Sequence, residues 1–150
     1  MDLILWRHAE AEDGIPDAER KLTGKGEKQA AKMAAWLNAH LPEGARVLVS
    51  PAERTRQTAA ALGRDCIIAK EVGPGASVAA LLGAAGWPDA KGAVVVVGHQ
   101  PALGQAAAYL LGNAQESWSV KKGGVWWFTN RARQDETQII LKAVMSPEFL

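Results

Sequence analysis

LILWRHAE, at residues 3–10, is an apolar run that breaks abruptly into an arginine and a histidine. Four apolar residues in succession are typical of a strand buried on both faces, as in the centre of a parallel sheet. A second run of this kind, GAVVVVGHQP at residues 92–101, also leads into a histidine. Ligands of such sheets bind outside the carboxyl ends of the strands. The two runs therefore predict a buried sheet with polar chemistry along one rim.

Helical and strand patterns alternate along the rest of the chain. The expected elements are a helix over 22–41, a strand over 45–50, a helix over 52–63, a short strand over 65–69, and helices over 78–86 and 102–112. The last third differs, because residues 123–144 read as two aromatic and β-branched strands joined by a polar turn, which is typical of a hairpin. This pattern predicts an α/β fold, a three-layer α/β/α sandwich with a mostly parallel central sheet.

The composition is that of an ordinary globular chain, and we expect a single domain over residues 1–150, with 48% hydrophobic and 22% charged residues. The net charge of +1, from 17 basic and 16 acidic side chains, excludes a broad basic surface for nucleic acid or membrane. Cys66 is the only cysteine and is expected to be a small core residue in the strand over 65–69. With no signal peptide and no apolar run of membrane length, the chain is predicted to be cytoplasmic.

Side chains that can bind an anion are predicted at the carboxyl ends of three strands. Arg7 and His8 follow the first strand, and His99 follows the strand within residues 92–98. Arg54 falls in the first turn of the helix after the strand over 45–50. Because these ends meet at one edge of a parallel sheet, two guanidiniums and two imidazoles are expected around one crevice.

This set of side chains favours a phosphoryl group as the ligand, and inorganic phosphate or sulfate is expected to bind there. Arginine presents a planar fork of donors to phosphate oxygens, and helix starts near Pro51 and Pro101 add backbone N–H groups. A neutral histidine can attack phosphorus while the arginines stabilise the charge of the transferred group. We expect no cofactor and no metal, because the chain has neither a carboxylate-rich motif nor the spacing of zinc ligands.

Four segments resemble, in the same order, motifs of the histidine phosphatase superfamily, which has the phosphoglycerate mutase-like fold. LWRHAEAE resembles the Arg-His-Gly motif that names the family, with Ala9 in place of the usual glycine. RKLTGKGEKQA resembles the Leu-Thr-x-x-Gly-x-x-Gln-Ala segment that opens the first helix. VLVSPAERTRQTA is similar to the segment that carries the second arginine, and VVVVGHQP to the strand that delivers the second histidine. The matches span most of the chain.

The resemblance implies a role for each matched residue. His8 would be the phosphorylated nucleophile, and Arg7, Arg54 and His99 would complete the phosphate pocket. Arg20, two residues before the Leu-Thr pair, is similar to a substrate-side arginine of the smallest members. The short, uncapped chain resembles the SixA-type phosphohistidine phosphatases, so the implied partner is a signalling protein phosphorylated on histidine.

Larger members of the family carry a carboxylic acid that protonates an alkoxide leaving group. The corresponding segment here is AKEVGPGAS, at residues 69–77, in which Glu71 is the only candidate proton donor. An imidazole leaves more easily than an alkoxide, so it tolerates a weaker acid or none. The site is therefore expected to suit a protruding phosphohistidine better than a small enclosed ester.

Other interpretations stay open at this point. The same pocket could serve a small phosphoester or a sugar phosphate, or it could bind phosphate without turnover. Arg20 could equally be a surface residue, and Arg54 taken alone could be an ion-pair residue on its helix. A dinucleotide site is disfavoured, because WRHAEAE contains no Gly-x-Gly-x-x-Gly turn.

Overall fold

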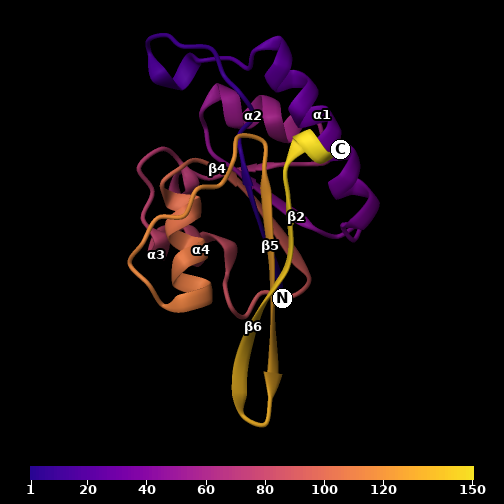
Figure 1. The fold of residues 1–150 in the computed structure, drawn as a ribbon, viewed down its shortest axis with the longest axis vertical. Coiled ribbons are helices and arrows are strands. Elements are labelled where there is room, and N and C mark those ends of the chain that lie inside the picture. The colour runs from indigo at the N-terminus through magenta and orange to yellow at the C-terminus, as the bar shows by residue number, and fades with distance from the viewer.

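One sheet of six strands, in the order β3-β2-β4-β1-β5-β6, forms the centre of the computed structural model, which describes residues 1–150 (Figure 1). The strands are β1 (Asp2–Arg7), β2 (Arg46–Val49), β3 (Ile67–Ile68), β4 (Ala93–Gly98), β5 (Val125–Arg133) and β6 (Glu136–Met145). The strands β3, β2, β4 and β1 are parallel neighbours, whereas β5 pairs antiparallel with both β1 and β6. The predicted α/β fold with a mostly parallel sheet is therefore confirmed.

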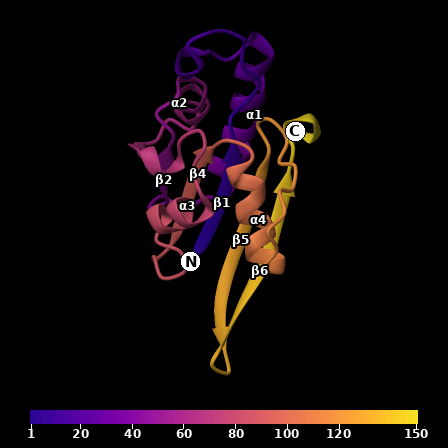
Figure 2. The same ribbon diagram turned by 90° about the vertical axis from the view of Figure 1, so that its left-hand side faces the viewer.

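Helices cover both faces of this sheet and give the expected three layers (Figures 1 and 2). The helices are α1 (Gly24–His40), α2 (Glu53–Ala60), α3 (Val78–Ala85) and α4 (Ala102–Gly112), with short 3-10 turns η1 (Asp17–Glu19), η2 (Lys70–Val72) and η3 (Pro147–Phe149). Apolar side chains of α1 and α2 pack on one face, and those of α3 and α4 on the other. None of the helices combines the length and the apolar character needed to cross a membrane.

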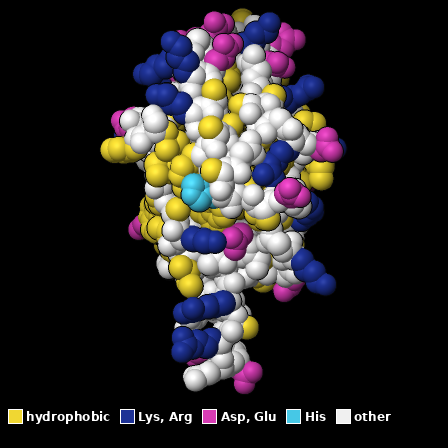
Figure 3. Space-filling model, turned by 90° about the vertical axis from the view of Figure 1, so that its right-hand side faces the viewer, with side chains coloured by type: hydrophobic (Ala, Val, Ile, Leu, Met, Phe, Trp, Pro, Cys, Tyr) yellow, Lys and Arg dark blue, Asp and Glu magenta, His cyan; other side chains and the backbone are white.

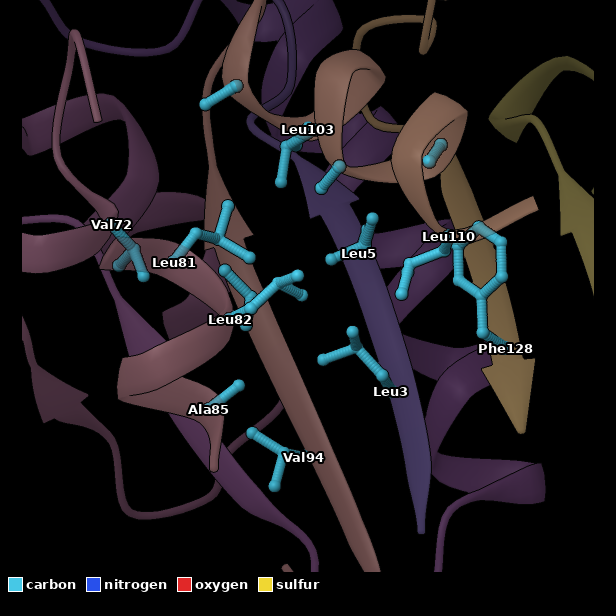
Figure 4. Packing of buried hydrophobic residues seen from close by; sticks show 14 of the residues in the cluster. Leu3, Leu5, Val72, Leu81, Leu82, Ala85, Val94, Leu103, Leu110 and Phe128 are labelled. Atoms are coloured by element: carbon cyan, nitrogen blue, oxygen red, sulfur yellow. The ribbon is translucent and has the colours of Figure 1, made fainter. Parts of the chain in front are cut away.

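The apolar run of β1 is explained by burial on both faces. Leu3 and Leu5 point into the core beneath α3 and α4, in the same cluster as Leu81 and Leu103 (Figure 4). The intervening Ile4 and Trp6 belong to the opposite core, beneath α1 and α2. The valines of β4 alternate between the two cores in the same way. Two central strands, each buried on both sides, therefore hold the residues that follow them in a fixed place.

The predicted hairpin is confirmed as β5 and β6. Trp126 and Trp127 point to opposite faces of the sheet, and each joins a different core. Gln134 and Asp135 form the two-residue turn with φ of 53° and 65°, the left-handed geometry that matches the twist of a tight hairpin. The outer half of the hairpin projects beyond the body of the molecule, away from the loops that follow β1 and β4 (Figures 1 and 3).

The prediction of a strand over residues 65–69 is largely wrong. Only Ile67 and Ile68 form β3, at the outer edge of the sheet, and both are about half exposed. Cys66 lies before this strand and is exposed, so it is not the core residue that the sequence pattern predicted. A short edge strand has a neighbour on one side alone, and a two-residue pairing with β2 buries little of its apolar surface.

Candidate active site

The two catalytic candidates among the histidines leave the sheet side by side, because β1 and β4 are adjacent parallel strands. Arg7 pairs with Gly98 in the register, and the backbone N–H of His8 donates to the carbonyl of Gly98 at 3.1 Å. The centroids of the His8 and His99 rings lie 5.4 Å apart. The two residues are 7% and 4% exposed, so they are nearly buried, and both line the cavity beside them. The predicted convergence of the two imidazoles is present.

Arg54 joins the histidines from the neighbouring strand. Strand β2 pairs with β4, and the first turn of α2 then carries Arg54, which is 5% exposed. Its Nη2 donates to Nδ1 of His99 at 3.3 Å and to the carboxylate of Asp17 at 3.1 Å. Its Nη1 donates to the backbone carbonyl of Asp17 at 2.9 Å. The guanidinium is therefore fixed on two sides beside the second imidazole.

A cavity of about 230 Å³ collects the predicted residues. Its lining consists of Arg7, His8, Ala11, Arg20, Arg54, Pro74, Gly75, His99, Gln100 and Lys122. The structure thus brings Arg7, His8, Arg54 and His99 together with Arg20. Glu71 is exposed on η2 and does not line the cavity, so the structure does not bring this candidate acid to the other residues.

The hydrogen bonds define which nitrogen of each imidazole is free. Nδ1 of His8 lies 2.7 Å from the carbonyl oxygen of Ala9, which can only accept, so Nδ1 carries the proton and Nε2 carries the lone pair. At His99 the guanidinium of Arg54 can only donate, so Nδ1 accepts and Nε2–H donates to Oγ of Ser50 at 2.7 Å. His8 therefore holds a nucleophilic nitrogen ready for an electrophile.

Burial and nearby cations keep both imidazoles neutral. The pKa of His8 is lowered to about 4, first by burial and then by the charges of Arg54 and Arg7, against the opposing hydrogen bond to Ala9. Burial also lowers the pKa of His99 to about 3, with Arg54 as the next cause. At neutral pH the lone pair on Nε2 of His8 is consequently not blocked by a proton.

This pKa shift predicts that acid destabilises the fold before carboxylates titrate. Each folded pKa is lower than the value of about 6.5 in an unfolded chain, so the unfolded state binds protons more tightly. The contribution of the two neutral histidines to the free energy of unfolding is complete above about pH 6.5, and it is lost as the pH falls toward their folded pKa values. At about pH 5 we expect His8 and His99 each to remove about 2 kcal/mol from the free energy of unfolding.

Urea unfolding at about pH 7 and pH 5 measures this difference, and ¹⁵N-histidine NMR measures the titration and the tautomers directly. The double variant His8→Asn/His99→Asn is expected to lose most of the difference between the two pH values. Titration midpoints of both rings near the free value of about 6.5 would contradict the assignment.

Two buried guanidinium nitrogens face no acceptor in the protein. Nε of Arg7 and Nε of Arg54 are both buried without a hydrogen-bond partner. The Nη1 of Arg7 is held by the carbonyl of Val120 at 2.9 Å, so this guanidinium is fixed while its Nε–H has no partner. Buried donors of this kind are costly unless an acceptor meets them. Because both side chains also line the cavity, their guanidiniums suit a tetrahedral oxyanion with several acceptor oxygens.

The loop after His8 is held by two glutamine side chains of the neighbouring helices. Oε1 of Gln29 accepts from the backbone N–H of Glu10 at 3.0 Å, and Oε1 of Gln57 accepts from that of Leu22 at 2.7 Å. Thr23 caps α1 by accepting from the N–H of Gly26 at 3.0 Å. Both amides therefore fasten the loop that follows His8 to the helices beside it.

Asp17 and Lys122 are parts of the site that sequence reasoning missed. Asp17 bridges two guanidiniums, accepting from Arg20 at 3.0 Å and from Arg54 at 3.1 Å. Arg20, followed by Arg54, lowers the pKa of the Asp17 carboxyl. Lys122 adds a further cation to the cavity lining. Asp17 lies on η1 and Lys122 on the turn before β5, both outside any motif, so the spacing of the sequence does not reveal them.

Comparisons with known proteins agree with this geometry. Residues 3–74 match the model of the histidine phosphatase superfamily (branch 1). An uncharacterised protein from Picosynechococcus sp. is 36% identical over 100% of this chain and 99% of its own length. The phosphohistidine phosphatase SixA of Escherichia coli is 40% identical over 45% of this chain and 42% of its own.

A solved structure of the protein histidine phosphatase SixA complexed with tungstate is similar over the whole chain. It superposes with a TM-score of 0.74 at 25% identity, covering 99% of both chains. The matching family motifs, the fold and the convergence of two imidazoles and two guanidiniums at one rim lead to one assignment. This chain belongs to the histidine phosphatase superfamily (branch 1).

Proposed function

We propose that this phosphatase removes the phosphoryl group from a phosphorylated histidine of a signalling protein, with His8 as the nucleophile. The observation that carries the proposal is the cavity itself. It combines a histidine whose Nε2 is unprotonated with the cations Arg7, Arg20, Arg54 and Lys122, and it has no carboxylate in its lining. The similarity to SixA supports the same substrate class.

The first step forms a covalent intermediate on His8. Its Nε2 lone pair attacks phosphorus, a bond between Nε2 and phosphorus forms, and the P–N bond of the substrate breaks. The leaving imidazole keeps the electron pair of that bond and takes a proton from solvent. Arg7 and Arg54 line the cavity, and their guanidiniums stabilise the negative charge on the phosphoryl oxygens.

The second step regenerates the enzyme. A water molecule attacks the phosphorus, the bond to Nε2 of His8 breaks, and the electron pair returns to the ring. Inorganic phosphate leaves, and one proton of the water goes to solvent. The hydrogen bond from Nδ1–H to the carbonyl of Ala9 keeps the ring in one tautomer throughout both steps.

The leaving group distinguishes this substrate class from phosphoesters. An alkoxide needs a proton from a positioned acid, whereas an imidazole is a far better leaving group. Glu71 does not line the cavity, and Nδ1 of His99 accepts a hydrogen bond, so neither is placed as a donor in this arrangement. A phosphoramidate suits this site better than an ester. A cytoplasmic location is part of the proposal, since the single exposed Cys66 suits a reducing compartment.

Kinetics with matched substrates test the proposal. A protein phosphorylated on histidine and a set of small phosphomonoesters, including a sugar phosphate, are compared by kcat/KM for phosphate release. We expect the phosphohistidine protein to be preferred by about 100-fold or more, the usual contribution of a general acid that the ester lacks here. Equal or faster turnover of a phosphomonoester would assign the enzyme to small esters instead.

A further inference from the structure

A second concave surface lies next to the catalytic cavity and is rich in lysine. It is a groove of about 580 Å³, and its basic residues are Arg7, Lys25, Lys28, Lys32, Lys121 and Lys122. We call it the lysine groove. Arg7 and Lys122 line both the groove and the catalytic cavity, so the two spaces are adjacent.

The groove has fixed walls. Lys25, Lys28 and Lys32 follow one face of α1 at helical spacing and are exposed. The opposite wall is the segment before β5, which is tied to the end of β1. The N–H of Gly123 donates to the carbonyl of Arg7 at 3.1 Å and to that of His8 at 3.0 Å. The groove is therefore held in register with the nucleophile.

The charge of the groove is almost uncompensated. Of its five lysines, only Lys121 forms an ion pair, with Glu148 at 2.9 Å. The whole chain has a net charge of only +1, so this concentration of one sign is local. Lys and Arg side chains gather at the upper left of the face in Figure 3, at the end of the molecule opposite the hairpin. Unpaired like charges side by side are unfavourable unless a partner of opposite charge covers them.

We infer that the lysine groove docks an acidic, convex surface of the phosphoprotein substrate, such as an acidic helix, while its phosphorylated side chain enters the catalytic cavity. This inference rests on the proposed function and specifies the substrate further. The catalytic cavity, of about 230 Å³, holds a phosphoryl group and its ring, so the rest of the protein must lie outside it. The groove is where that surface meets the enzyme.

The lining of the lysine groove also argues against nucleic acid and membrane lipids as its ligands. Val120 is its only hydrophobic residue, and no aromatic side chain is present on which a nucleobase could stack. A flat membrane surface does not enter a concave groove as a helix can. Lysine ammonium groups on flexible stems match carboxylates spread over a protein surface, whereas arginine forks are the usual choice for discrete phosphates.

Charge reversal of two groove lysines tests the inference. The variant Lys28→Glu/Lys32→Glu changes exposed residues that do not line the catalytic cavity. Its matched control is Lys91→Glu/Arg133→Glu, which makes the same change of charge at exposed positions outside both spaces. At low salt we expect the groove variant to lose about 10-fold to 100-fold in kcat/KM for a phosphohistidine protein with an acidic surface.

Three further measurements make the test decisive: hydrolysis of a small substrate, the dependence on salt, and competition by RNA. Phosphoramidate, a small P–N substrate, should be hydrolysed equally by all variants, and the loss on the phosphoprotein should shrink at high salt because exposed charges are screened. A groove variant no worse than its control, or one equally impaired toward phosphoramidate, would overturn the inference. Competition by an RNA oligonucleotide that depends on Lys28 and Lys32, without competition by an acidic protein, would reassign the groove to nucleic acid.

The outcome remains separable from that of the proposed function. If the unaltered enzyme hydrolyses phosphoramidate or an ester but no phosphohistidine protein, the proposed substrate fails. Binding of a polyglutamate peptide to the folded chain then decides the docking inference by itself. Peptide binding that is lost in Lys28→Glu/Lys32→Glu and kept in the control supports an acidic-protein groove, and equal binding to both variants rejects it.

Discussion

Replacement of His8 by alanine is expected to lower phosphate release by at least about 10⁴-fold, the scale at which loss of a nucleophile acts. The side chain supplies the only unprotonated ring nitrogen that is free of a hydrogen-bond partner in the cavity, because Nδ1 of His99 accepts from Arg54. Water would then have to attack the substrate directly. The guanidiniums of Arg7 and Arg54 would remain, so binding of inorganic phosphate should survive the loss of turnover.

The intermediate gives the sharpest measurement. With ³²P-labelled phosphohistidine protein, rapid quenching of the unaltered enzyme should trap a label on the chain that is stable to alkali and released by acid. His8→Ala should carry no such label. The control is His40→Ala, which removes an exposed histidine at the end of α1 and should leave both label and rate unchanged.

The remaining outcomes of this experiment distinguish the other interpretations of the site. Full activity in His8→Ala would remove this residue from the mechanism. Tight phosphate binding by the unaltered chain without turnover of any substrate would identify a binding module. Thermal unfolding of each variant with phosphate present separates loss of chemistry from loss of fold, since a ligand that binds the native state raises Tm.

The convergence of Arg7, His8, Arg54 and His99 could be predicted from the sequence because two simple rules act together. Continuous apolar runs specify parallel strands that are buried on both faces, and the carboxyl ends of parallel strands share one edge of the sheet. His8 and His99 follow such runs directly, so their proximity depends only on β1 and β4 being neighbours. Hydrophobic patterns alone do not give the order of the strands, and the structure shows that β1 and β4 are neighbours.

The parts of the site that lie on loops were beyond those rules. The position of Asp17 depends on the path of a polar segment with no periodic pattern. Lys122 could have been found by one further step, because a strand antiparallel to β1 must begin at the rim where β1 ends. Glu71 was placed by analogy with larger proteins, and its exposed position on η2 follows from local backbone geometry that no motif encodes.

Cys66 shows the same limit for the core. An apolar run predicts burial, but whether the strand is central or at the edge depends on pairing partners far along the chain. β2 is the only strand that pairs with Ile67 and Ile68, and the segment stays exposed. The hydrophobic sequence thus predicts where a strand lies along the chain, whereas the place of that strand in the sheet determines whether it is buried.

Gly26→Ala is expected to destabilise the fold by about 3 kcal/mol and to lower kcat/KM by about 100-fold or more, on the scales of overpacking and of misplaced catalytic groups. A Cβ at this buried glycine would overlap the carbonyl oxygen of Glu10. That carbonyl cannot move freely, since it accepts from the N–H of Thr23 at 3.0 Å, and it lies two residues after His8. The added methyl group must therefore displace the loop that follows His8 or the start of α1.

The chain contains its own control for this change. Gly24 lies in the same turn, but a Cβ there meets no atom within 4 Å. Gly24→Ala is expected to keep full activity and to change the free energy of unfolding by no more than about 1 kcal/mol, in the stabilising direction, because alanine favours a helix. Urea unfolding and kcat/KM of both variants measure the contrast. Equal behaviour of the two would mean that the contact between Gly26 and Glu10 does not position His8, and that this glycine is needed for nothing more than helix geometry.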